Sequence, residues 1–219
     1  MDVRVSSGEI SRIMSSTRFA ARIAALMVIV FLTGCGDRTD SGQGQEAASD
    51  NHSPGANGAA SDAPLVAAAR RGNLKAVDSL LAQGAEVNAS DILGRTPLHA
   101  ASFYCRKKSA ELLIAKGANV NATDATKMTP LHAAVLAGCA EITTLLMDKG
   151  ADINSPTETG LTPLHLAAAI GGYQPAKLLI QRGADVNRKD RDGRTPRFYA
   201  SRNEHGQTST LLQKNGGKE

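Results

Sequence analysis

Three histidines recur at an even spacing and raise the question of a metal site. His99, His132 and His165 lie 33 residues apart, and each closes a Thr-Pro-Leu-His tetrad. Zinc holds its nitrogen ligands at about 2.0–2.1 Å. If the tetrads occupy equivalent places in successive packed helices, roughly 10 Å apart, one ion cannot bridge them. We therefore expect no metal site and no other cofactor.

The hydroxyl groups and glycines do not form a catalytic set either. Thr96, Thr129 and Thr162 each precede a proline, where a hydroxyl caps a helix and proline fits the first helical position. The sequence contains no Ser/His/Asp arrangement and no phosphate-binding glycine loop followed by lysine. We therefore predict that the protein is not an enzyme. An enzymatic alternative would have to use the polar cluster at 202–205, which resembles a terminal cap more closely.

The interval that separates the histidines runs through the whole region after residue 61. The tetrad returns in degenerate form as Thr195-Pro196-Arg197-Phe198, and a Gly-Ala pair recurs at 84, 117, 150 and 183. Self-similarity at a fixed period of this length indicates stacked repeats. The pattern resembles the ankyrin repeat over residues 62–217. The resemblance implies an all-α ankyrin-repeat solenoid, in which each unit is a helix-turn-helix with a β-hairpin loop.

The residues of one unit support this interpretation independently. Thr129-Pro130 opens a first helix, Gly138 marks a turn, and a second helix from about Ala140 ends near Gly150. Because a single unit cannot bury its leucines alone, the units must stack. We predict about five units, near 62–90, 91–123, 124–156, 157–189 and 190–217. The resemblance also implies that each tetrad histidine hydrogen-bonds to backbone in the neighbouring turn.

Binding positions follow from the register, because ankyrin repeats contact partners through the hairpin tips and the exposed side of the first helix. Phe103 and Tyr104 stand out in a chain with only four phenylalanines, three tyrosines and no tryptophan, since aromatic anchors often dominate interfaces. They could join Ile92, Leu93 and Leu136 in one apolar patch, or they could fill space beside Cys105. The predicted protein-binding residues are Ile92, Leu93, Phe103, Tyr104, Lys127, Leu136, Glu158, Ile170 and Arg191.

Cys105 and Cys139 are candidates for a disulfide. Cys105 takes the place that Gly72, Gly138 and Gly171 hold in other units, and Cys139 follows that place in the next unit. An exported location would favour the bond. A disulfide needs Cα atoms within about 7 Å, however, and stacked equivalent positions lie farther apart unless the chain bends locally. A structural disulfide and two free thiols both stay open.

The first 34 residues predict an export signal. Arg18 and Arg22 precede an uncharged apolar run over 23–34, and this run is shorter than the roughly 20 residues that span a bilayer. Leu32-Thr33-Gly34-Cys35 resembles the bacterial lipobox, which implies that Cys35 becomes the acylated first residue of the mature chain. We predict a signal peptide over 1–34, with Met14 as an alternative start, and a lipidated Cys35 with a flexible tether over 35–61.

The resemblance to ankyrin repeats and the absence of a catalytic set make protein binding the expected function. The formal net charge is +4 and 42% of residues are hydrophobic, which excludes a dominant nucleic-acid-binding face and disorder of the whole chain. We expect a monomeric scaffold that binds a protein partner and no nucleic acid. It would be held by a lipid anchor in a bacterial cell envelope, facing the periplasm, and would protect or regulate an envelope enzyme. A cytosolic or secreted effector or regulator, and an immunity-type binder of a toxin, remain alternatives.

Overall fold

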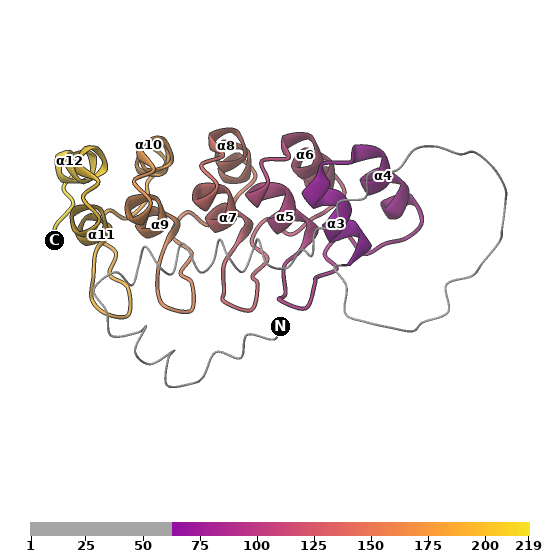
Figure 1. The fold of residues 1–219 in the computed structure, drawn as a ribbon, viewed down its shortest axis with the longest axis horizontal. Coiled ribbons are helices and arrows are strands. Elements are labelled where there is room, and N and C mark those ends of the chain that lie inside the picture. The colour runs from indigo at the N-terminus through magenta and orange to yellow at the C-terminus, as the bar shows by residue number, and fades with distance from the viewer. Residues whose placement is uncertain (1–62) are drawn as a thin grey trace, which may run out of the picture.

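The computed structural model describes residues 63–219. This part contains ten helices in five consecutive pairs, which we call units 1 to 5 (Figure 1). The first helices of the pairs are α3 (Pro64–Arg71), α5 (Pro97–Phe103), α7 (Pro130–Leu136), α9 (Pro163–Ala169) and α11 (Pro196–Arg202). The second helices are α4 (Leu74–Ala82), α6 (Lys107–Ala115), α8 (Ala140–Asp148), α10 (Tyr173–Gln181) and α12 (Gly206–Lys214). The predicted all-α solenoid is confirmed, whereas the predicted signal peptide, Cys35 and the tether lie outside the described residues.

The Thr-Pro pairs set where the first helices begin. In α5 and α7 the side chains of Thr96 and Thr129 accept a hydrogen bond from the backbone N–H three residues later, and proline follows at once. These caps satisfy backbone donors that have no partner within the helix. In units 2 to 5 the Thr-Pro pair therefore fixes the start of the first helix independently of the neighbouring units, whereas α3 starts at Ala63-Pro64 without a side-chain cap.

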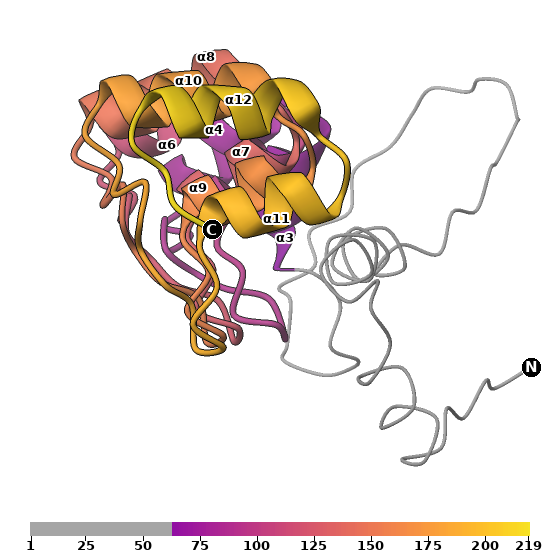
Figure 2. The same ribbon diagram turned by 90° about the vertical axis from the view of Figure 1, so that its left-hand side faces the viewer.

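The helices form two layers. Figure 2 looks along the stack and shows the first helices in one layer and the second helices in the other, with long loops on one side and the turns within each pair on the opposite side. One alanine of every first helix is at most 5% exposed, which lets neighbouring helices approach closely: Ala68, Ala101, Ala134, Ala167 and Ala200. Leucines at one position of α6, α8, α10 and α12 are fully buried and fill the space between the layers: Leu113, Leu146, Leu179 and Leu212.

The loops between units are closed by turns, and none of them contains a regular strand within residues 63–219. In unit 2 the Asp91 carboxylate accepts hydrogen bonds of 2.9 Å from the backbone N–H groups of Leu93 and Arg95. Asp124 and Asp190 do the same in units 3 and 5. Side-chain bonds of this kind replace strand pairing in a short loop, so the expected hairpins form without a β-ladder of their own.

Neighbouring loops are joined through their backbones. The N–H groups of Ala125, Glu158 and Arg191 donate to carbonyl oxygens of the preceding loop at distances of 2.9–3.1 Å. Asparagine side chains add a second set of bonds near the bases of the loops, such as Asn121 Oδ1, which accepts from Asp152 N–H at 2.8 Å. The loops therefore form one continuous, hydrogen-bonded edge along the stack.

The last unit departs from the pattern at its tetrad. Phe198 stands where the other tetrads have histidine, and the Thr195 hydroxyl donates to the carbonyl of Lys218 at 2.5 Å. Tyr199 donates its hydroxyl to Asp190, a contact that the earlier units lack. The chain following α12 therefore covers part of the surface that a further unit would otherwise cover.

No helix within residues 63–219 is both long enough and apolar enough to cross a membrane.

Two loop glycines provide a matched test of the edge. Gly160 and Gly193 both have positive φ, but a Cβ at Gly160 would lie 2.9 Å from the backbone nitrogen of Arg191, whereas one at Gly193 would meet nothing within 4 Å. We expect Gly193→Ala to cost about 1–2 kcal/mol through backbone strain alone. Gly160→Ala should cost about 2–4 kcal/mol because it also disrupts the loop contact. Urea unfolding measures both values, and equal losses would contradict the role given to the loop contact.

Candidate protein-binding surface

The three tetrad histidines use both ring nitrogens in hydrogen bonds within the protein. His99 Nδ1 accepts from the backbone N–H of Thr96 at 3.1 Å and from its hydroxyl at 2.9 Å. Because Nδ1 accepts, Nε2 carries the proton and donates to the carbonyl of Met128 in unit 3 at 3.0 Å. His132 and His165 repeat this arrangement with the carbonyls of Leu161 and Arg194 in the next unit. Each imidazole thus joins two units, as the resemblance implies.

Burial keeps these imidazoles neutral. Desolvation lowers the pKa of His132 to about 4 and also lowers the pKa of His99 and of His165, against a smaller opposing effect of their backbone hydrogen bonds. Within residues 63–219 no group of three His, Cys, Asp or Glu side chains is placed to hold a metal ion. The histidines therefore act as uncharged connectors.

Three of the turns within the pairs, in units 1, 2 and 4, are covered by side chains from the following unit. Arg106 Nε donates to the carbonyl of Arg70 at 3.0 Å, and its Cδ would lie 2.8 Å from a Cβ added at Gly72. In the same way His205 bonds the carbonyl of Ala169 at 3.1 Å and its ring lies over Gly171. The covering residue stands 34 positions after the glycine that it covers, one more than the repeat period.

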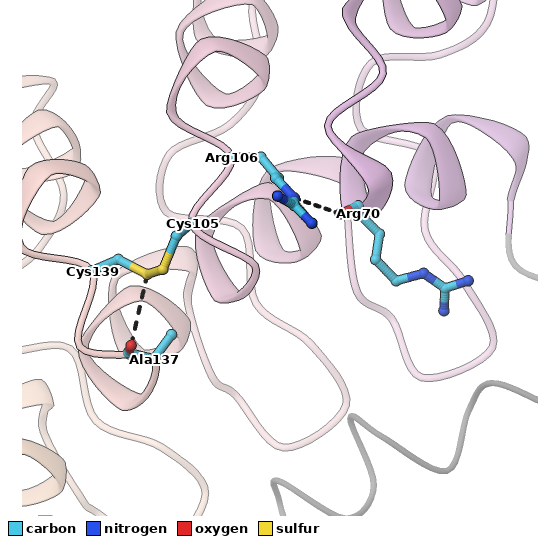
Figure 3. The surroundings of a disulfide bond; sticks show 5 residues. All are labelled: Arg70, Cys105, Arg106, Ala137 and Cys139. Carbon is cyan, nitrogen blue, oxygen red and sulfur yellow. Dashed lines mark hydrogen bonds between the residues drawn. A yellow bond between two sulfur atoms is a disulfide. The ribbon is translucent and has the colours of Figure 1, made fainter. Parts of the chain in front are cut away.

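The cysteines occupy this same pair of positions. The structure joins Cys105 to Cys139 by a disulfide, with Cα atoms 5.6 Å apart and a sequence separation of 34 residues (Figure 3). Cys105 takes the left-handed conformation of the glycine that it replaces, with φ of 55°. The offset of one residue brings the Cα atoms within bonding range, so no bend of the stack is needed.

The loop tips carry five of the predicted binding residues. Ile92 is 74% exposed, which makes it the most prominent large apolar side chain of residues 63–219. Leu93 is half-buried, while Lys127, Glu158 and Arg191 are exposed. Lys127 adopts φ of 60°, close to the conformation of the glycines at its place in the other units, so its tip keeps the common shape. We call these five residues the tip row.

The other four predicted residues lie at the C-terminal ends of the first helices. Phe103, Tyr104, Leu136 and Ile170 are all half-buried. The rings of Phe103 and Tyr104 meet edge to face, with centroids 5.3 Å apart. Ile92 precedes α5 and Phe103 ends it, so the structure places the predicted apolar residues in two rows at opposite ends of the first helices. We call the second set the helix-end row.

A family model for ankyrin repeats in three copies matches residues 41–124, 65–157, 123–190 and 155–218. The chain belongs to the ankyrin-repeat family. Ankyrin repeats are protein–protein interaction scaffolds and are typically not enzymes. No curated protein matches the chain in sequence.

Sequence reasoning missed two features of this ankyrin stack. It did not identify the covering positions, although Arg106, Cys139 and His205 each stand one residue beyond the turn position. It also gave no role to the basic residues 106–108, which directly follow the aromatic pair. The contiguous run Arg-Lys-Lys was the available signal for the second feature.

Loss of the disulfide should destabilise the ankyrin stack. We expect Cys105→Ser/Cys139→Ser to lower the free energy of unfolding by about 2–4 kcal/mol, because the closed loop is long and serine keeps the left-handed strain. Cys105→Gly/Cys139→His copies the Gly171–His205 pair and should recover part of that loss. Urea unfolding with and without reductant checks this, and a wild-type midpoint that reductant leaves unchanged would contradict it.

Acidification should weaken the stack through its histidines. The folded pKa values of the three histidines lie below the unfolded value of about 6.5, so their contribution is complete above that pH and is lost as the pH falls through the folded pKa, which is about 4 for His132. For His132 the loss is on the order of 3 kcal/mol at pH 4.

Urea unfolding between pH 7 and pH 4.5 would measure this effect. His132→Gln should be less stable at pH 7 but should lose less stability on acidification than the wild type. If both proteins show the same pH dependence, His132 is not a neutral connector.

Proposed function

We propose that this chain is an envelope-anchored, non-catalytic ankyrin scaffold that binds another protein through its tip row and helix-end row. The observation that carries the proposal is the aromatic pair Phe103–Tyr104, held half-buried at a helix end, together with Ile92 at 74% exposure. Aromatic and aliphatic side chains that remain partly exposed on a well-packed scaffold mark an interaction surface. The role that we propose is protection or regulation of an envelope enzyme.

The use of the other reactive groups supports a binding role. The tetrad threonines and histidines are committed to helix caps and to inter-unit bonds. His205 is hydrogen-bonded to the carbonyl of Ala169, and Asn203 donates to the same oxygen at 2.8 Å. The polar cluster at 202–205, which was the enzymatic alternative, is thus partly occupied in covering the turn of unit 4. What the described surface offers to another molecule is shape, apolar contact and exposed charge.

The envelope location rests on the order of residues near the N-terminus. Arginines, an apolar run and Leu-Thr-Gly-Cys follow one another as they do in lipoprotein signals. Several acyl chains on Cys35 would hold the protein firmly, since one chain alone binds a membrane only marginally. The 26 residues between Cys35 and Asp62 would then let the stack reach roughly 25–30 Å from the anchor.

Crosslinking in intact envelopes tests the binding role. A Phe103→Ala/Tyr104→Ala variant, first shown to fold, is compared with the wild type and with Lys177→Ala/Gln181→Ala on the exposed outer face of α10. We expect a partner that the wild type and the outer-face control retain and the aromatic variant loses by at least tenfold, as for an interface hot spot. Recovery of the same proteins from all three variants would show that the aromatic pair serves packing.

Metabolic labelling with a fatty acid tests the anchor. The wild type should incorporate the label and fractionate with membranes, whereas Cys35→Ala should do neither. An unlabelled wild type in the soluble fraction would favour the cytosolic or secreted alternative and would leave the binding test intact.

A further inference from the structure

The turn of unit 2 joins the aromatic pair to an unusual run of cations. Residues 103–108 read Phe-Tyr-Cys-Arg-Lys-Lys and pass from the end of α5 into the first turn of α6. The Arg106 side chain reaches the C-terminal turn of α3, where Arg70 and Arg71 end the helix (Figure 3). Arg71 and Lys108 are exposed. The adjacent turns of units 1 and 2 thus hold Arg71, Arg106, Lys107 and Lys108, which we call the basic turn.

These cations do not serve the stability of α6. Lys107 and Lys108 occupy its first turn, which contains no acidic residue, and cations are unfavourable at the positive end of a helix. Lys107 pairs with Glu141 at 3.2 Å, but both side chains are largely exposed, and such pairs contribute little. The two lysines at this unfavourable end of the helix are better explained by a ligand that they bind.

The surface changes character on the other side of unit 2. The corresponding residues of units 3 and 4 read Leu-Ala-Gly-Cys-Ala-Glu over 136–141 and Ala-Ile-Gly-Gly-Tyr-Gln over 169–174. These turns are mainly apolar and hold no cation, and their one charged residue is Glu141, the partner of Lys107. Leu136 and Ile170 are half-buried there. The disulfide between Cys105 and Cys139 joins the basic turn directly to the first of these apolar turns. Charge and apolar surface therefore adjoin in a fixed order along the stack.

We propose that this edge receives an extended protein segment that carries acidic side chains at one end and apolar side chains at the other. The inference rests on the proposed function and specifies its partner. The acidic end would lie over Arg71, Lys107 and Lys108, and the apolar end over Leu136 and Ile170. Helices pack about 10 Å apart and an extended chain advances about 3.3 Å per residue, so about six residues separate the two ends.

The charges of the next unit favour such a segment over a continuous polyanion. Residues 91–123 carry five basic and two acidic side chains, whereas residues 124–156 carry two basic and four acidic ones. A nucleic acid lying along this edge would next meet Glu141 and then the turns of units 3 and 4, which hold no basic residue to bind its phosphates. A segment whose negative charge is confined to one end needs no basic residue there.

A random peptide library tests the inference without knowledge of the natural partner. The full chain, held through a C-terminal tag, is used to select displayed peptides of about 12 residues, the extended length that crosses the five units. We expect selected peptides to place Asp or Glu about six residues from Leu, Ile, Phe or Tyr. Charge reversal by Arg71→Glu/Lys108→Glu should weaken them about tenfold, and added salt should reduce that difference.

The control variant Lys116→Glu/Lys177→Glu changes the net charge equally at exposed positions away from the basic turn and should leave affinity unchanged. The inference would be overturned if the selected peptides contained no acidic residues, failed to bind Phe103→Ala/Tyr104→Ala and still bound the charge-reversed variant. That result would support the proposed function. Equal weakening by both charge variants would also overturn the inference, since the effect would then come from net charge. Failure to select any peptide would count against both.

Discussion

The stack depends on one buried bond that units 2, 3 and 4 each make to the following unit, whereas unit 1 has Val66 at this position. The tetrad imidazole accepts from its own threonine cap on one side and donates to a carbonyl of the following loop on the other. Both ring nitrogens are used, and the ring is shielded from water, so the bond holds only for the neutral imidazole. Its geometry fixes how far apart successive helices lie and which way each loop points. Where the fifth unit has no successor among the described helices, phenylalanine replaces the histidine.

Because this bond and the buried alanines fix the spacing of the units, the turns within the pairs can carry different kinds of residue. Three of the turns are covered by arginine, a cysteine disulfide and histidine from the next unit, all through the same offset of 34 residues. The turn at Gly138 has nothing within 4 Å of where a Cβ would lie, because Gly172 stands at the covering position. The stack therefore tolerates variation at these turns, and they are where this chain places its aromatic, basic and apolar residues.

The sequence predicted the features that repeat with the 33-residue period, and it missed the features that depend on contacts between units. The helix starts at Thr-Pro, the left-handed turn glycines and the five pairs follow from local rules that act within one unit. The cysteine pairing stayed open because equivalent positions appeared too distant, and only the structure shows that the bond joins non-equivalent ones. Likewise Ile92 and Phe103 share a unit but lie at opposite ends of α5, a separation that the sequence pattern did not express.

The tetrad histidines are engaged in bonds within the stack, and the stack exposes aromatic, basic and apolar side chains in a fixed order. Such a rigid surface is suited to holding one partner in one orientation. A photo-crosslinking amino acid at position 104, compared with one at the exposed position 181 of α10, tests this most directly in living cells. The account predicts one dominant crosslinked protein from position 104 and none from position 181. The same products from both positions, or none from position 104, would contradict it.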